Sequence, residues 1–222
     1  MRQRRKLKKA IAIVGEGPTE WFYFEYIRKD RRYTFTLKPE LPGHSDFSAL
    51  FRKAKDLVNQ SYDLVFCVLD LDTIAQNTQR LQTFKNECKR LPKRIIPITS
   101  YPCIEFWFLL HFHAYPKTRV FQTCDEVLRE LHRFIPDYMK NQKFLESLTC
   151  FKAMEKDGQY DRALSNGTNI LHQVEMDTKP FQRSFSEVGE MLQYVEQCKL
   201  CDFRKDCLSC ENKLKTLYPS KS

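Results

Sequence analysis

The stretch IAIVGEGPTEWFYFEY, residues 11–26, decides the expected fold. Its apolar start is typical of a buried strand, and a Gly-Glu-Gly-Pro turn ends that strand. An aromatic segment then begins like a helix, with Pro18 just before it and Thr19 as the expected cap. One carboxylate, Glu16, therefore stands between two glycines at the tip of a buried strand, where it can meet polar groups that follow other strands.

Strand patterns and helix patterns alternate through the first hundred residues. Further strands are predicted at YTFTLKP (33–39), DLVFCVLD (63–70) and RIIPITS (94–100), with Pro97 favouring a sheet edge or a strand end. Helices are predicted at 45–60, with Ser45 as cap, and from Leu81 to Leu91. This order predicts a mostly parallel sheet flanked by helices, with right-handed crossovers.

From residue 104 onward the pattern is helical. Helices are predicted near 124–135, 141–155, 159–176 and 184–197, and the best hinge candidate in this half is GQYDRALSNGTN (158–169). The predicted organisation is a basic arm at 1–9, an α/β domain at 10–183, and a C-terminal helix with a short cysteine-rich tail at 184–222.

Acidic residues follow three of the predicted strands. Glu16 follows the first, Asp70 and Asp72 end the third, and Glu105 comes shortly after the fourth. Because the carboxyl ends of parallel strands share one edge, we expect these groups to lie together. Alternate side chains of an extended strand end point the same way, so Asp70 and Asp72 could face one Mg²⁺ or Mn²⁺. Alternatively, one aspartate caps the next helix and the other is solvated.

The GEGPTE turn has its own chemical interpretation. Glu16 could ligate a metal or act as general base on an attacking water. Gly15 and Gly17 would let the backbone approach a bound phosphate or ion closely, although an ordinary strand-to-helix turn has the same appearance. The turn lacks the Gly-Lys-Ser/Thr of a Walker A sequence, which excludes a P-loop at this position.

The segment SYPCIEFWFLLHF, residues 100–112, carries two polar groups in an apolar context. A buried carboxylate is costly unless it is paired, so Glu105 is expected to cap the helix, bind a second ion or pair with a lysine. His111 is interpreted as a hydrogen-bonded core histidine. Lys140, in YMKNQK, is one of many lysines, and its local sequence alone does not mark it as a functional residue.

Composition points to a polyanionic partner. The 222-residue chain carries a net charge of +9, and six of its first nine residues are basic. Nucleic acid is the commonest partner of such a chain, although a basic arm can also serve solubility alone. No apolar stretch approaches the ~20 residues needed to cross a bilayer, so we expect a cytoplasmic protein without a membrane partner.

The nine cysteines fall into two groups. Four have the spacing Cys-x₂-Cys-x₅-Cys-x₂-Cys, which suits zinc, with an iron–sulfur cluster or no metal as alternatives. They are Cys198, Cys201, Cys207 and Cys210. The others are expected to be reduced, small hydrophobic residues rather than a disulfide framework. They are Cys67, Cys88, Cys103, Cys124 and Cys150.

The three acidic motifs in this order resemble the RloB family, whose members have a Toprim fold and are linked to phage-defence loci. The resemblance covers about residues 8–145, includes a loose match at PGHS (42–45), and is most particular in SYPCIEFW. It implies Mg²⁺-dependent phosphodiester chemistry, with Glu16 matching the metal-binding or acid/base glutamate and Asp70 and Asp72 the metal-holding aspartates. The tail from about 184 departs from the usual ending of the family.

The resemblance also implies two further features. Lys140 is the counterpart of a lysine that assists the phosphate in the nuclease branch, and an ABC- or AAA-type ATPase partner is implied. The sequence therefore predicts a divalent-metal-dependent nuclease in antiphage defence, acting on DNA or RNA, with an oligomer possible. The alternatives are a non-catalytic nucleic-acid-binding module and a regulatory subunit of a defence ATPase complex.

Overall fold

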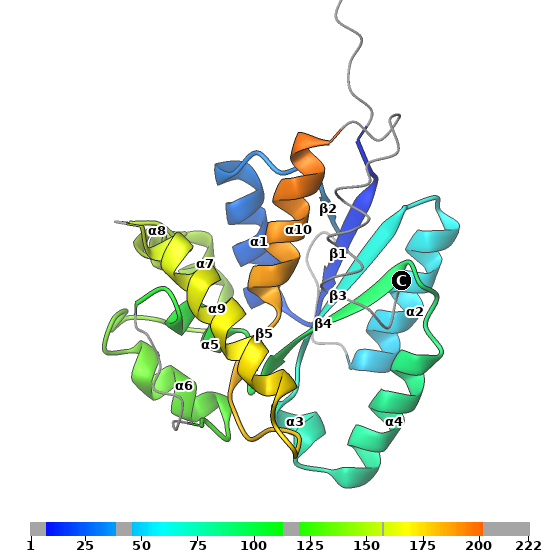
Figure 1. Cartoon of the computed structure of the whole chain (residues 1–222). Coiled ribbons are helices and arrows are strands. Elements are labelled where there is room, and N and C mark those ends of the chain that lie inside the picture. The colour runs from blue at the N-terminus through cyan, green and yellow to red at the C-terminus, as the bar shows by residue number, and fades with distance from the viewer. Residues whose placement is uncertain (1–7, 39–45, 113–119, 157, 202–222) are drawn as a thin grey trace, which may run out of the picture.

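A five-stranded sheet forms the centre of the molecule in a computed structural model that describes residues 8–38, 46–112, 120–156 and 158–201 (Figure 1). The strand order is β2-β1-β3-β4-β5. The first four strands pair in parallel, and β5 is antiparallel to β4. This confirms the mostly parallel α/β fold. The strands are β1 (Ile11–Gly15), β2 (Thr36–Leu37), β3 (Leu64–Asp70), β4 (Ile95–Tyr101) and β5 (Phe185–Ser186).

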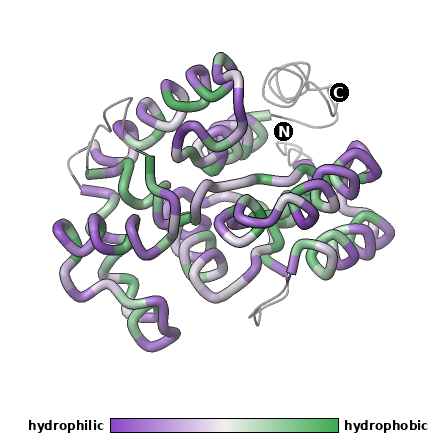
Figure 2. Tube along the Cα trace, turned by 90° about the horizontal axis from the view of Figure 1, so that it is seen from below, coloured by the Kyte–Doolittle hydropathy of each residue, from purple (hydrophilic) through white to green (hydrophobic). Residues whose placement is uncertain are grey.

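Helices cover both faces of the sheet. Side chains alternate along β1, so that Ile11 and Ile13 join one buried cluster while Ala12 and Val14 join the other. The second cluster lies under α2 (Phe47–Asn59) and α4 (Thr78–Lys89). The first lies under α1 (Pro18–Asp30), α10 (Val188–Leu200) and the rest of the helical half. Hydrophilic and hydrophobic residues alternate around the outer helices (Figure 2).

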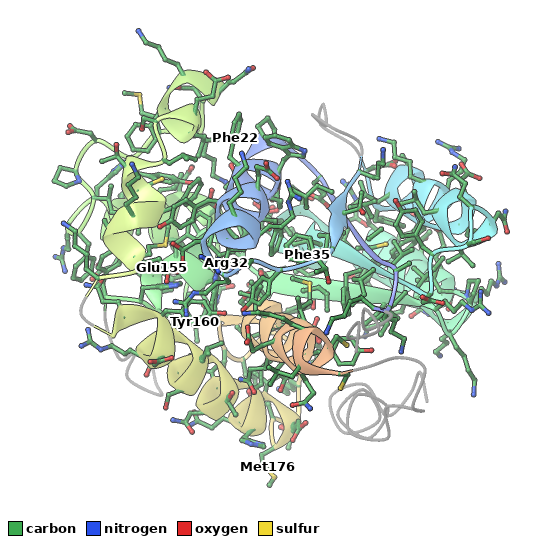
Figure 3. The ribbon with its side chains drawn as sticks, turned by 90° about the horizontal axis from the view of Figure 1, so that it is seen from above. Phe22, Arg32, Phe35, Glu155, Tyr160 and Met176 are labelled. Carbon is green, nitrogen blue, oxygen red and sulfur yellow. A yellow bond between two sulfur atoms is a disulfide. The ribbon has the colours of Figure 1, made fainter. Side chains whose placement is uncertain are left out.

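The helical half packs around one buried tryptophan. Trp107, in α5, has no exposed surface, and its indole Nε1–H donates a 2.6 Å hydrogen bond to the hydroxyl of Tyr23 in α1. Arg31, the C-cap of α1, pairs with Glu155, and its guanidinium lies 3.9 Å from the ring centre of Tyr160. Glu155 and Tyr160 are labelled in Figure 3. The helices of this half are α5 (Glu105–Leu109), α6 (Cys124–Leu131), α7 (Gln142–Glu146), α8 (Thr149–Met154) and α9 (Gln159–Glu175).

Several local predictions were wrong at helix ends and turns. The N-cap of α1 is Gly17, so the predicted cap Thr19 lies inside the helix. The N-cap of α2 is Asp46 rather than Ser45, and Oδ1 of Asp46 accepts a 2.9 Å hydrogen bond from the Ala49 N–H. The predicted helix at 141–155 is two helices, because Leu148 has a left-handed backbone (φ 57°). The hinge candidate at 158–169 is the start of α9, where Gly167 is packed against Trp107.

The C-terminal segment contributes to the same sheet and core. Ser186 pairs with Ser100 and Phe185 with Tyr101, while α10 packs on the sheet through buried residues such as Leu192. Because β5 pairs only with Ser100 and Tyr101, the part of β4 that contains Pro97 pairs with β3 but not with β5. Pro97 lies opposite Cys67 of β3. A proline is tolerated there because, among the described strands, no second partner requires its missing N–H.

Candidate functional site

The register of the sheet sets the position of the acidic residues. Gly15 pairs with Val68, so β3 continues two residues past β1 before it ends at Asp70, which pairs with Ser100. Glu16 directly follows β1 at the same edge. The Oδ1 atom of Asp70 accepts a 2.8 Å hydrogen bond from the backbone N–H of Ile104, the residue before α5. This bond ties the end of β3 to the segment that carries Glu105.

Asp72 reaches this edge by a different geometry from the one predicted. The strand ends at Asp70, Leu71 is helical (φ −102°, ψ −1°), and Asp72 begins the short helix α3 (Asp72–Ala75). Its Oδ1 accepts from the backbone N–H of Thr73 at 2.6 Å. The alternation of an extended strand therefore does not relate the two aspartates. Asp72 is nevertheless near enough to Glu16 to raise the pKa of that carboxyl.

The carboxyl of Glu16 titrates far above its usual range. Burial raises its pKa from 4.5 to about 8, and the negative charges of Glu20 and Asp72 contribute in the same direction. The guanidinium of Arg80 and a hydrogen bond to the backbone of Asp70 act against this rise. Burial likewise raises the pKa of Asp70, with further contributions from Glu20, Glu105 and Glu16.

Glu20 belongs to the same cluster, and the sequence interpretation missed it. It is buried in the first turn of α1, where its Oε2 accepts a 2.9 Å hydrogen bond from the Gly17 N–H. Burial and the charge of Glu105 raise its pKa to about 7. A Cβ at Gly15 would lie 2.7 Å from the Cβ of Glu20, so that glycine makes room for Glu20. The sequence feature that could have indicated Glu20 is its place at the third position of the helix. A glutamate there is also a common helix-capping pattern, so it does not by itself indicate a functional site.

Glu105 is held by partners from the helical half. Its side chain has no exposed surface; Oε2 lies 3.0 Å from the ammonium of Lys140, and Oε1 accepts a 2.9 Å bond from the hydroxyl of Tyr138. Burial lowers the pKa of Lys140, but the charges of Glu105 and Asp70 outweigh it and leave the pKa raised. Pairing with a lysine was one of three expectations for Glu105, and it is the arrangement found.

Cys103 and Cys124 form a disulfide bond, with a Cα–Cα distance of 5.6 Å. The prediction that both are reduced hydrophobic residues was therefore wrong, because the fold brings the residues before α5 and at the start of α6 together. The sulfur of Cys124 lies 3.4 Å from Oε2 of Glu105 and 3.1 Å from the ammonium of Lys140. Cys67 and Cys150 are buried in the core as predicted.

The other predicted residues lie away from this cluster or outside the described chain. His111 is a core histidine: its Nδ1–H donates to the carbonyls of Trp107 and Phe108, and burial lowers its pKa to about 4. Cys198 is a free cysteine buried in α10, and Cys201, the C-cap of that helix, is disulfide-bonded, whereas Cys207 and Cys210 lie outside the described residues. Metal binding by the tail, which would require Cys201 to be reduced, stays a prediction.

The basic arm is described only in part, and the PGHS turn (42–45) lies entirely outside the described residues. Residues 1–7 and 39–45 lie outside the described chain. Lys8 donates to the backbone carbonyls of Lys199 and Cys201, and Lys9 lies 3.2 Å from the hydroxyl of Tyr194. These two lysines of the arm thus contact the C-terminal helix region.

The chemistry of the donors suits a hard divalent cation, although among the described residues no three of the clustered carboxylates have oxygens that all lie within 4.8 Å of one another. Glu16, Glu20, Asp70, Asp72 and Glu105 bring five carboxyl groups to one edge of the sheet, against the ammonium of Lys140 and the guanidinium of Arg80. Buried carboxylates without enough positive charge are forced toward their protonated forms, which is why the pKa values of Glu16, Glu20 and Asp70 rise. Oxygen donors are the ligands that Mg²⁺ and Mn²⁺ prefer.

A parallel sheet with an acidic cluster at the carboxyl ends of its strands defines a Toprim-like α/β protein. The chain belongs to the RloB-like protein family, whose model matches residues 11–195. The match extends well past residue 145 and includes most of α10, so the expectation that family likeness stops before 184 was wrong. No curated protein and no solved structure matches the chain significantly. Among the described residues, no helix is both long and apolar enough to span a bilayer.

Proposed function

We propose that this protein is a divalent-metal-dependent nuclease that acts in antiphage defence. The observation that carries the proposal is the convergence of Glu16, Asp70 and Glu105, from three separate segments, on one edge of the sheet, where the charges of Glu16 and Glu105 both raise the pKa of Asp70. Structural carboxylates are normally solvated or paired one to one, whereas here, among the described residues, five carboxylates lie near two cationic side chains, Lys140 and Arg80. Such an excess of negative charge suits a site whose occupant is a cation with a phosphate.

Glu16, Asp70 and Asp72 would hold Mg²⁺ or Mn²⁺, and the ion would polarise the scissile phosphate and stabilise the charge that develops on it. The side chains of the protein divide the remaining tasks. If Glu16 is instead left free of the ion, its carboxylate can accept a proton from an attacking water. The Lys140 ammonium can neutralise a phosphate oxygen, and Glu105 holds that ammonium in place.

The overall charge supports a nucleic-acid substrate and leaves its type open between DNA and RNA. A net charge of +9 favours association with a polyanion, even though the site itself is acidic. Family membership motivates two further parts of the proposal: a role in phage defence, and a partner ATPase that controls when the nuclease is active.

The decisive experiment is cleavage by purified protein of duplex DNA, single-stranded DNA and tRNA, in Mg²⁺ or Mn²⁺ and in EDTA. Asp70→Asn removes a charge at the centre of the cluster, and Asp161→Asn removes one from an exposed position on α9 as a matched control. We expect metal-dependent cleavage by the wild type and the control, and a loss of about 10²-fold or more in Asp70→Asn. Equal cleavage by both variants would refute the assignment.

A non-catalytic protein would give a different result in the same assay. Nucleic acid would be bound equally well in EDTA and in Mg²⁺, and no substrate would be cleaved by the wild type. A regulatory subunit would instead co-purify with a neighbouring ATPase and acquire activity only in that complex. The panel therefore separates the nuclease from both alternatives.

A further inference from the structure

The side of the acidic cluster nearest α6 carries sulfur as well as oxygen donors. Sγ of Cys103, Sγ of Cys124 and a carboxylate oxygen of Glu105 all lie within 4.8 Å of one another. Cys103 and Glu105 have no exposed surface, and Cys124 is half-buried. The three side chains come from the segment just before α5, from α5 itself and from the start of α6. This is a built cluster of three potential ligands, and the nuclease proposal assigns no role to its two sulfurs.

We propose that Cys103, Cys124 and Glu105 form a binding site for a thiophilic divalent cation such as Zn²⁺ when the Cys103–Cys124 disulfide is reduced. Two thiolates with one carboxylate are a ligand set that Zn²⁺ accepts, and a water can complete a tetrahedral site. The magnesium site of the proposed nuclease would be built from oxygen donors only. The inference shares Glu105 with that site but does not require nuclease activity.

The disulfide and the metal site exclude each other. A dithiol reductant gives two electrons and two protons to the Cys103–Cys124 bond, which breaks to two thiols while the reductant becomes a disulfide. Binding of Zn²⁺ then releases the two thiol protons to solvent. With Zn–S bonds of about 2.3 Å in a tetrahedral site, the two sulfurs must separate to roughly 3.7 Å, which side-chain rotation can supply once the bond is broken.

The present structure shows that a cation is accepted at this position. The ammonium of Lys140 lies 3.1 Å from Sγ of Cys124 and 3.0 Å from Oε2 of Glu105. The Lys140 side chain is 38% exposed, whereas that of Glu105 is fully buried. Lys140 can therefore swing into solvent while the sulfurs and the carboxylate stay. A divalent cation at this site would replace the ammonium, and removal of Lys140 should strengthen metal binding.

Co²⁺ binding to reduced full-length protein tests the proposal, because cobalt–thiolate bonds give a charge-transfer absorption independent of nuclease activity. The tail cysteines can also bind cobalt, so the readout is a difference between variants. We expect Cys103→Ser and Cys124→Ser to bind one Co²⁺ fewer per chain than the wild type. Cys150→Ser, which removes a buried thiol elsewhere in the core, should bind the same number as the wild type. After oxidation of the protein, the difference between wild type and Cys124→Ser should disappear.

Equal cobalt stoichiometry in the wild type and in Cys124→Ser would overturn the proposal. If the serine variants do not fold, Lys140→Met and its control Lys143→Met give the answer, because both leave all three ligands in place. We expect Lys140→Met to raise cobalt affinity about tenfold, the equivalent of one displaced ion pair, and Lys143→Met to leave it unchanged. Equal affinities in these two variants would also refute it. Loss of cleavage in Asp70→Asn with cobalt binding retained would show that the two proposals stand separately.

Discussion

The ammonium of Lys140 lies 3.0 Å from Oε2 of Glu105, and this ion pair joins the helical half of the chain to the acidic edge of the sheet. Glu105 is fully buried, and Tyr138 binds its other carboxylate oxygen at 2.9 Å. Tyr138 and Lys140, just before α7, thus complete a site whose carboxylates lie at or just after the ends of β1, β3 and β4. The helical half is therefore part of the site rather than an appendage to it.

Removing Lys140 should destabilise the protein through Glu105. Lys140→Met leaves a buried carboxylate without its counter-ion, and we expect the free energy of unfolding at neutral pH to fall by about 2 kcal/mol, less than for a fully buried pair because Lys140 is partly exposed. Denaturant unfolding measures this value. The double variant Glu105→Gln/Lys140→Met should recover much of the loss, whereas exposed Lys143→Met should change stability by less than about 0.5 kcal/mol. An unchanged stability in Lys140→Met would contradict the pairing.

Two helical glycines that face Trp107 should respond oppositely to alanine. A Cβ at Gly189 would lie 2.9 Å from Cζ3 of the buried indole, whereas a Cβ at Gly167 would lie 3.6 Å from the same atom. We expect Gly189→Ala to lower the free energy of unfolding by about 1–3 kcal/mol through overpacking. Gly167→Ala should leave it unchanged or raise it by up to about 1 kcal/mol through better helix propensity. Thermal unfolding compares the two, and an equal shift in both would show that Trp107 does not limit this contact.

The raised pKa of Glu16 predicts that the metal-free protein loses stability as pH rises. Its pKa is 4.5 when unperturbed and about 8 in the folded state, so the folded state holds the proton more tightly. This contribution is complete below pH 4.5, declines as pH rises, and is lost above about pH 8. Unfolding in EDTA between pH 5 and 9 should show the decline, amounting to at most about 4–5 kcal/mol for this group.

Glu16→Gln tests the source of that decline. Glutamine keeps the shape of the side chain without its charge, so the variant should be more stable than the wild type at pH 9 and lose less stability between pH 5 and 9. Mg²⁺ should reduce the decline in the wild type, because a bound cation favours the ionised carboxylates. If the two proteins show the same pH dependence in EDTA, a raised pKa of Glu16 is not the source of the decline.

His111 predicts a loss of stability in acid. Burial lowers its pKa from 6.5 to about 4, so between these pH values the histidine is protonated in the unfolded chain but neutral in the folded protein. Its contribution is complete above pH 6.5 and is lost progressively down to about pH 4, by up to roughly 3 kcal/mol. The free energy of unfolding of the wild type, measured relative to that of His111→Leu, should therefore fall as pH falls from 7.5 to 4.5. A difference that stays constant over this range would contradict the buried neutral histidine.

The sequence predicts those features of the site that follow from strand order. Parallel strands place their carboxyl ends at one edge, so the association of Glu16 with Asp70 could be expected from an apolar run followed by an acidic residue, found twice. The prediction that Asp70 and Asp72 lie at the same edge as Glu16 was right, but the reason given for it, the alternation of side chains along an extended strand, was wrong. Strand β3 ends at Asp70, so Asp72 is not part of an extended segment and instead begins the helix α3.

The features that were missed depend on tertiary packing. Glu20 has the sequence signature of a helix cap, and only the close approach of Gly15 shows that it is buried beside the other carboxylates. Lys140 was singled out by the family resemblance alone, and its pairing with Glu105 depends on the packing of the segment before α7 beside α5. The Cys103–Cys124 bond has the same origin, since a separation of 21 residues carries no signal of proximity by itself.

Calorimetric titration of Mn²⁺ tests the central claim most directly, because it asks whether the clustered carboxylates hold a divalent cation at all. The account predicts saturable binding to the wild type and to the exposed control Asp161→Asn, and binding weakened by at least about tenfold in Asp70→Asn. Identical Mn²⁺ isotherms for the wild type, Asp161→Asn and Asp70→Asn would contradict it.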